Sequence, residues 1–244
     1  MTRPLSSQVS VNPMEGELRI PAGVHDFEAF RRWSRSRRFP QEGRIDYLRG
    51  DIDASMSPED LLTHATPKAA VAGVLYSLIV VPGRGLVFVD STRYASPAVQ
   101  LSVEPDVVVV LHETLAAGRV RMVPTAPPRP GRYIELEGAP DLVVEVISDS
   151  SVGKDRRRLP ELYAQAGVPE LWLVDARDTR LAFEIWTLGT TAYTQVLPDP
   201  DGGTSSTSAW TASPILGCRF RLRRHERHEP PVRWYTLEST GARS

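Results

Sequence analysis

Four short apolar runs, each preceded by a glycine or an acidic residue, dominate the hydrophobic pattern of the chain. They cover Leu86–Asp90, Val107–Leu111, Leu142–Ile147 and Leu171–Asp175. A run that stays apolar, without alternating polar residues, is typical of a strand buried on both faces of a sheet. We therefore predict that these four segments are the main strands of the protein.

Helical spacing marks two segments before the first of these strands. Asp26 suits an N-cap, and the aromatic residues behind it recur at helical intervals, namely Phe27, Phe30 and Trp33. Ser57-Pro58-Glu59-Asp60 combines a capping serine, a proline and two acids, which is typical of a helix start. We predict that a second helix begins here, is interrupted or restarted at Pro67, and continues with an apolar face from Lys68 to Val81.

A third helix is predicted between the last two strands. Its apolar positions are Leu159, Leu162, Tyr163 and Ala166. Because proline is tolerated only in the first turn of a helix, Pro160 indicates that the regular part starts near Leu159. Gly167 then ends it.

Turn residues predict two hairpins and complete the outline of the fold. The first hairpin turns at Arg49-Gly50, and the second joins Phe183–Leu188 to Thr191–Val196 around Gly189. Ile215–Leu222 is expected to return as a last strand. This order predicts one α/β domain with a mixed sheet flanked by helices and an added β-hairpin. We expect a flexible lead-in over residues 1–25, the domain over 26–222, and a charged tail over 223–244.

Composition narrows the class of protein. The chain has 244 residues, of which 41% are hydrophobic and 24% charged, as expected of one globular domain. Its net charge of -1 argues against charge-driven binding of nucleic acid, so any such contact must come from local patches. The lone Cys218 excludes an intramolecular disulfide framework and a cysteine metal cluster. No membrane-length apolar run or secretory signal is apparent, so the cytoplasm is the expected location.

Glu145 interrupts the apolar pattern of its strand. A buried carboxylate without a partner is costly or takes up a proton, so we infer a compensating charge beside it. A divalent metal is the simplest candidate, with Asp106 on the neighbouring strand as the second ligand. Asp141 is nearer in sequence, but four strand residues span about 13 Å, which is too far to share one ion. We interpret Asp141 as a strand-start residue.

A cationic loop follows the strand of Glu145. It contains Lys154 and three consecutive arginines, Arg156, Arg157 and Arg158, at the entrance of the third helix. The only other lysine of the chain is Lys68. Hydrolysis of a phosphodiester needs a metal that lowers the pKa of its water and a cation that orients this water or stabilises the developing charge. The loop supplies such a cation.

Plainer interpretations stay open for each of these residues. Asp106 follows a proline, where an aspartate is often a turn or cap residue. Glu145 has an arginine as an alternative partner to a metal. Arginine runs and single lysines are frequently solvated, which applies to Arg156–Arg158 and to Lys154. His64 and His112 have no metal spacing and are expected to be surface or satisfied histidines, and Cys218 a buried structural thiol.

Several of these segments together resemble a known family. They are Pro105-Asp106, the stretch from Pro140 to Ser148, Lys154-Asp155, and the specific block Ala166-Gly-Val-Pro-Glu-Leu-Trp-Leu-Val-Asp175. They resemble the Uma family of putative restriction endonucleases, within the PD-(D/E)XK nuclease superfamily, over about residues 26–222. The resemblance implies a restriction-endonuclease-like core that binds magnesium. It implies that Asp106 is the Asp of the Pro-Asp step and Glu145 the acid of (D/E)XK.

The chain departs from the family pattern at the lysine. Ile147 stands two residues after Glu145, where the motif has its lysine, and Leu159 stands where many members carry a displaced one. Lys154 or one of the three arginines would have to substitute. An arginine does not readily lose a proton, so it would stabilise charge without serving as a base.

These observations predict a metal-dependent endonuclease that acts on DNA. Asp106, Glu145 and the Ile147 carbonyl would hold Mg²⁺, or Mn²⁺ in its place. Lys154 would position the water, Arg156–Arg158 would contact phosphates, and Glu59 or Asp60 would add an outer-shell acid. Two alternatives are a nuclease fold that binds nucleic acid or protein without catalysis, and an unrelated α/β protein in which Glu145 pairs with an arginine. A homodimer would suit double-strand cutting, and no motif names a recognition sequence.

Overall fold

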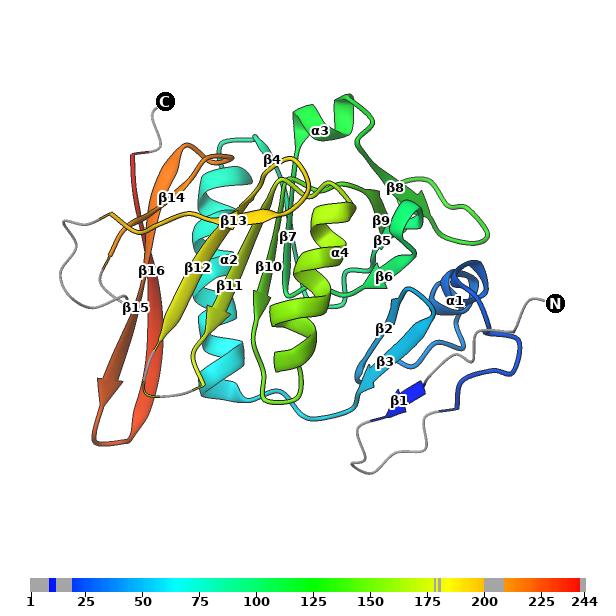
Figure 1. Cartoon of the computed structure of the whole chain (residues 1–244), viewed down its shortest axis with the longest axis horizontal. Coiled ribbons are helices and arrows are strands. Elements are labelled where there is room, and N and C mark those ends of the chain that lie inside the picture. The colour runs from blue at the N-terminus through cyan, green and yellow to red at the C-terminus, as the bar shows by residue number, and fades with distance from the viewer. Residues whose placement is uncertain (1–8, 12–18, 178, 180, 200–208, 242–244) are drawn as a thin grey trace.

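Two mixed β-sheets and a smaller antiparallel sheet build the molecule (Figure 1). The computed structural model describes residues 9–11, 19–177, 179, 181–199 and 209–241. The seven-stranded sheet has the order β1 Val9–Val11, β3 Asp51–Ser55, β2 Arg44–Leu48, β6 Leu101–Val103, β5 Tyr94–Ser96, β9 Tyr133–Gly138 and β8 Val120–Pro124. The six-stranded sheet has the order β13 Tyr193–Gln195, β12 Ala182–Leu188, β11 Glu170–Asp175, β10 Leu142–Val146, β7 Val107–Leu111 and β4 Gly85–Val89. The three-stranded sheet consists of β14 Thr211–Ser213, β15 Cys218–Arg227 and β16 Val232–Thr240.

The helices lie between and beside these sheets. They are α1 Phe27–Ser34, the π-helical turn η1 Leu61–Ala65, α2 Thr66–Ile79, the 3₁₀ turn η2 Pro97–Val99, α3 His112–Ala116, the π-helical turn η3 Lys154–Arg158 and α4 Leu159–Gln165. In Figure 1, α2 and α4 lie on opposite sides of the six-stranded sheet. None of the described helices is long and apolar enough to cross a membrane. The chain therefore has the predicted α/β architecture of mixed sheets flanked by helices.

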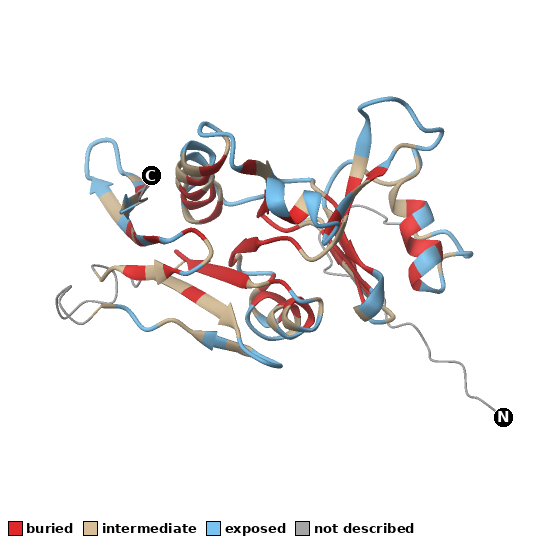
Figure 2. Ribbon diagram, turned by 90° about the horizontal axis from the view of Figure 1, so that it is seen from above, coloured by how far each residue is buried: buried red, intermediate tan, exposed pale blue. Residues whose placement is uncertain are grey.

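The four predicted main strands are neighbours in the six-stranded sheet. Val107 and Val144 face α2, whereas Val108 and Val143 belong to the clusters on the other face. All four side chains are buried, and Figure 2 shows buried strands in the middle of the molecule with less buried strands beside them. Burial on both faces explains why these segments are apolar without alternation.

The strand register brings the two candidate acids together. β10 pairs with β7 in the antiparallel direction, with Leu142 opposite Val109 and Val144 opposite Val107. One further step in this register places Glu145 opposite Asp106, and side chains of opposite residues point to the same face of a sheet. The predicted adjacency of these two residues is confirmed.

The predicted start of the second helix at Ser57 is wrong. Residues 57–60 are not helical, and Asp60 is the N-cap, whose carboxylate accepts the N–H groups of Leu62 and Thr63. The wide turn η1 follows, in which the N–H of Ala65 donates to the carbonyl of Asp60 at 3.0 Å. Pro67 lacks the N–H that a continuous α-helix would need here, so regular winding resumes only in α2. The third helix has the same design, since η3 precedes α4 at Leu159 and Pro160, as predicted.

The expected boundary at residue 222 is also wrong. It falls inside β15, and residues 232–240 of the expected tail form β16, which pairs with β15 along its length. Tyr235 and Leu237 are buried in the core cluster that covers α2. The numerous charges concealed this strand pair, because only every second residue faces the core. Of the expected lead-in, Val9–Val11 form β1, and residues 1–8 and 12–18 lie outside the described residues.

We expect Leu237→Ala to lower the free energy of unfolding by about 2–4 kcal/mol, because the change leaves a cavity in a packed core. The matched control is Thr236→Ala on the exposed side of the same strand, for which a change below about 0.5 kcal/mol is expected. Urea denaturation measures both. Equal stability of the two variants would show that the hairpin is not part of the folded core.

Candidate active site

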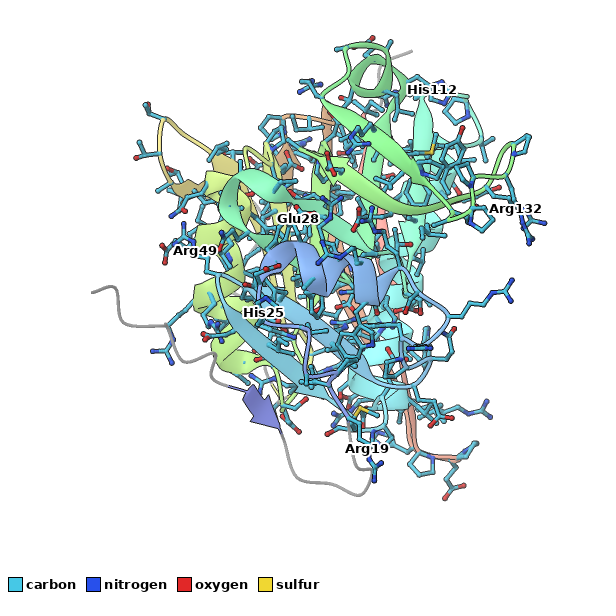
Figure 3. The ribbon with its side chains drawn as sticks, turned by 90° about the vertical axis from the view of Figure 1, so that its right-hand side faces the viewer. Arg19, His25, Glu28, Arg49, His112 and Arg132 are labelled. Carbon is cyan, nitrogen blue, oxygen red and sulfur yellow. The ribbon has the colours of Figure 1, made fainter. Side chains whose placement is uncertain are left out.

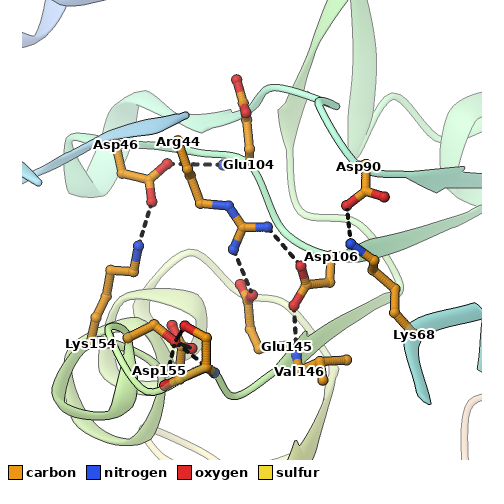
Figure 4. Close-up of polar contacts among 12 residues, drawn as sticks. Arg44, Asp46, Lys68, Asp90, Glu104, Asp106, Glu145, Val146, Lys154 and Asp155 are labelled. Carbon is orange, nitrogen blue, oxygen red and sulfur yellow. Dashed lines mark hydrogen bonds and ion pairs between the residues drawn. The ribbon is translucent and has the colours of Figure 1, made fainter. Parts of the chain in front are cut away.

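A guanidinium lies between the two candidate acids (Figure 4). Arg44, from β2, places Nη2 2.6 Å from Oδ1 of Asp106 and Nη1 4.0 Å from Oε2 of Glu145. The side chains of Asp106 and Glu145 are 0% and 1% exposed. The sequence left a metal and an arginine open as partners of Glu145, and in this structure Arg44 holds that place.

Other groups complete the surroundings of the pair. The N–H of Val146 donates to Oδ2 of Asp106 at 2.6 Å, and Nε2 of His64 lies 3.5 Å from the same oxygen. The hydroxyl of Tyr163, on α4, donates to Oε1 of Glu145 at 2.5 Å. Among the described residues, Oε2 of Glu145 has no hydrogen-bond partner although it is buried.

The two acids have opposite pKa shifts. Burial raises the pKa of Glu145 well above its usual range, and the charges of Asp106 and Asp155 raise it further, which Arg44 and Tyr163 oppose only in part. Burial alone would also raise the pKa of Asp106, but Arg44, His64 and the Val146 N–H lower it. The pKa shifts of the pair therefore favour a proton on Glu145 over one on Asp106.

Asp155 is a third acid near this pair, supplied by the turn η3. Its Oδ2 accepts from the hydroxyl of Ser151, and its buried Oδ1 has no hydrogen-bond partner among the described residues. Burial raises the pKa of Asp155 to about 6, and Asp106 adds to this rise. The site thus carries more acidic oxygens than Arg44 alone can neutralise.

Lys154 lies inside the molecule and not in solvent. Its side chain is 7% exposed, and Nζ donates to Oδ2 of Asp46 at 2.9 Å and lies 3.4 Å from Oδ1 of Asp53. Burial would lower the pKa of Lys154, but Asp46, Asp155 and Asp53 raise it above its usual value. Lys154 is therefore a permanent cation at neutral pH, suited to charge stabilisation rather than to proton abstraction.

The three arginines of the loop are directed elsewhere. Arg156 donates to Asp175 at 2.9 Å and to Glu184 at 3.4 Å, and Arg158 donates to Asp51 at 2.9 Å. Arg157 is exposed. The structure does not bring this run to the acid pair.

A cavity of about 480 Å³ opens above the acid pair. Its lining includes Arg44, His64, Lys68 and Lys154, so both lysines of the chain meet here. Six acids also line it, namely Asp53, Glu59, Asp60, Asp90, Glu104 and Asp149. Among the described residues that line the cavity, Asp106 and Glu145 are absent, because Arg44 and His64 stand between them and the opening.

The predicted outer-shell acids both line this cavity. Oε1 of Glu59 accepts a hydrogen bond from Nζ of Lys68 and lies 2.5 Å from Nδ1 of His64. Asp60 caps η1, so its carboxylate is occupied by backbone N–H groups. Glu59 thus connects to Asp106 through His64, whereas Asp60 shapes the turn that carries His64.

Comparison with known proteins adds a family to this geometry. The model of the Uma2 family, described as "Putative restriction endonuclease", matches residues 27–234. The chain belongs to this family. This chain is also similar to a solved structure that is described as a putative nuclease belonging to DUF820 from Anabaena variabilis ATCC 29413. The two share 17% sequence identity with a TM-score of 0.47, and the match covers 71% of this chain and 83% of that chain. A comparison with curated proteins found no match.

For this Uma2 chain, the donors suit a hard cation only if Arg44 moves. Among the described residues, no group of three or more His, Cys, Asp or Glu side chains is arranged to hold a metal ion. Carboxylate oxygens are the ligands that Mg²⁺ prefers, and the unpartnered oxygens of Glu145 and Asp155 are of this kind. The guanidinium of Arg44 fills the space between Asp106 and Glu145. The oxygens are thus of the right chemical kind for a divalent ion, but the acid pair would be open to one only if this side chain withdrew.

Sequence reasoning missed most of the residues that surround the acids. They are Arg44, Asp46, His64, Lys68, Asp155 and Tyr163. Asp46 offered one signal, because it lies between two apolar residues of a predicted strand, yet this alternation also suits a solvent-facing position. Asp46 is buried because the seven-stranded sheet packs against the turn that carries Lys154. Asp141 was interpreted correctly, since it accepts the N–H of Leu111 and the hydroxyl of Thr114.

We expect Lys154→Met to lower the free energy of unfolding by about 3 kcal/mol, because it leaves the buried Asp46 without its main cation. Arg158→Met removes a more exposed pair with Asp51, and a loss below about 1 kcal/mol is expected. Chemical denaturation at pH 7 compares the two. A Lys154→Met variant as stable as wild type would mean that this lysine is free of Asp46 in solution.

Proposed function

We propose that this protein is a metal-dependent endonuclease that hydrolyses phosphodiester bonds of DNA. The supporting observation is the buried pair of Asp106 and Glu145, opposite each other on central strands beneath a polar cavity. A pure binding protein has little need to bury two acids behind the residues that line a cavity. Membership of a restriction endonuclease family supports the same reaction class.

Mg²⁺, or Mn²⁺ in its place, is the proposed cofactor. Asp106, Glu145 and the carbonyl oxygen of Ile147 would hold it, and Asp155 is a further oxygen donor nearby. When bound, such an ion lowers the pKa of its water and stabilises negative charge on the phosphate. Glu145 must lose its proton to become a ligand, so metal affinity should rise with pH.

The side chains of the cavity wall have separate proposed roles. Lys154, held by Asp46 and permanently charged, orients the attacking water or stabilises the developing charge. His64 joins Asp106 to Glu59 and steadies the orientation of Asp106. Arg44 lines the cavity, so a guanidinium released from the acids would face an incoming phosphate.

A catalytically inactive binding protein is the second candidate. Arg44 already neutralises Asp106, and Lys154 is engaged by Asp46, which is an arrangement that is stable without a metal. The unpartnered oxygen of Glu145 favours the nuclease, because a binding protein would gain nothing from an unsatisfied buried group.

Cleavage of plasmid DNA with Mg²⁺ or Mn²⁺ is expected for wild type, with Asp106→Asn and Glu145→Gln each reducing the rate by about 100-fold or more. Both substitutions keep the shape of the side chain while removing a charged ligand. Glu113→Gln, an exposed acid on α3, is the control and should cleave like wild type. Absence of cleavage by wild type across DNA and RNA substrates and both metals would favour the binding protein. Equal cleavage by all four proteins would indicate a contaminant.

Arg44→Ala should bind Mn²⁺ about tenfold more tightly than wild type in calorimetry, because the variant has no guanidinium to displace. In EDTA the same variant should melt at a lower temperature, since the buried acids lose their cation, and Mg²⁺ should restore more of its stability than it adds to wild type. Arg44→Lys keeps a positive charge, so its Mn²⁺ affinity and its melting temperature should lie between those of wild type and Arg44→Ala. Unchanged metal affinity in Arg44→Ala would place the metal away from this guanidinium.

A further inference from the structure

The cavity by itself is poorly equipped to hold a nucleic acid. Its lining contains six acids against two lysines, one arginine and one histidine. Arg156 and Arg158, the predicted phosphate contacts, are paired with acids of the same chain. DNA carries a negative charge at every phosphate, so an acidic cavity repels it. The affinity of this protein for DNA would therefore depend on cations outside the cavity.

The hairpin of β15 and β16 carries such cations on one face. Alternate residues Cys218, Phe220 and Leu222 are buried, and the intervening positions point the other way. These positions form what we name the cationic stripe, consisting of Arg219, Arg221, Arg223, His225 and Arg227. Four of these five positions are arginines, so this face of β15 is rich in positive charge, whereas the exposed Glu226 belongs to the other set of alternate residues and pairs with Arg224 and Arg233.

The charge of the stripe is only partly balanced within the chain. Arg219 pairs with Asp199 at 2.7 Å, and Glu238 is shared between Arg221 and Arg223. Arg227 has no acidic partner within 4 Å among the described residues. The ring of His225 stacks on Trp234 of β16 with 5.2 Å between centroids, and Trp234 is 44% exposed. The stripe thus ends in an exposed aromatic pair beside an arginine without an acidic partner.

The position of the hairpin connects it to the candidate active site. β16 packs against η1, the turn that carries His64 and follows Asp60. In Figure 1 the hairpin tip lies on the same, lower side of the molecule as the end of β10 and the start of α4, with β11 and β12 between them. The hairpin is therefore joined to the turn that lines the cavity, and the stripe lies on the hairpin face that is turned away from α2.

We propose that the cationic stripe binds the phosphate backbone of a DNA duplex outside the active site. A two-stranded ribbon is narrow enough to follow or enter the major groove, and arginines along one face meet the charge that DNA presents. In this proposal the acidic cavity carries out the hydrolysis, and the cationic stripe provides the affinity for DNA. This inference rests on the proposed function in one respect, namely that DNA is the substrate.

The test measures binding of a fluorescent 30-base-pair duplex in EDTA, without cleavage, by anisotropy between 50 and 200 mM salt. Arg223→Gln/Arg227→Gln should bind about 10- to 100-fold more weakly at 100 mM salt, and its plot of log affinity against log salt should lose about 2 from its slope. The matched control is Arg129→Gln/Arg132→Gln, which removes the same charge from two exposed arginines of the β8–β9 loop. Figure 3 shows Arg132 at an outer edge of the molecule.

Each outcome decides between the two proposals. Weaker binding by the stripe variant alone supports DNA binding by the cationic stripe, whether or not wild type cleaves DNA with Mg²⁺. Equal binding by both double variants overturns the ribbon and leaves the nuclease standing if wild type cleaves. Wild type that neither binds nor cleaves DNA overturns both. Binding of wild type to anionic lipid vesicles in place of the duplex would overturn the ribbon in favour of a membrane surface.

Discussion

The cost of burying two carboxylates inside the central sheet governs the arrangement of the elements around them. Asp106 and Glu145 lie on neighbouring strands with no access to bulk water, so each requires a donor or a cation from another element. β2 supplies Arg44, η1 supplies His64 and α4 supplies Tyr163. The two large sheets are therefore joined at this point by electrostatics as well as by packing.

The same constraint explains why the site is poised for a cation. Arg44 compensates Asp106 well, but among the described residues Oε2 of Glu145 and Oδ1 of Asp155 have no hydrogen-bond partner, and burial raises the pKa of Glu145. A single guanidinium does not satisfy all of these oxygens. A compact divalent ion would satisfy more of them, provided that the arginine can withdraw into the cavity that it lines.

Both lysines of a chain with 29 lysines and arginines lie at this cavity, whereas Arg44 is the one arginine among its described lining residues. A lysine presents a compact point charge, whereas an arginine spreads its charge over a planar group that suits carboxylates and phosphates. This distribution matches a division between chemistry in the cavity and backbone binding on the hairpin. The hairpin carries its arginines on the face turned away from the core.

The sequence by itself determined the elements whose residues interact with their near neighbours. Apolar runs placed the four central strands, Pro160 placed the start of α4, and the Asp106–Glu145 pair followed from adjacent strands. The sequence-based prediction of a helix start at Ser57 was wrong, because Pro67 delays regular helical winding. The prediction beyond residue 222 was wrong because β15 buries only alternate residues, and the charged residues between them concealed the strand. Only the tertiary structure decided that Arg44 and His64 meet these acids and that Asp46 meets Lys154, because these contacts join segments about 40 or more residues apart. Local patterns report which face of an element is apolar, but which distant charge fills a buried gap depends on how the sheets pack together.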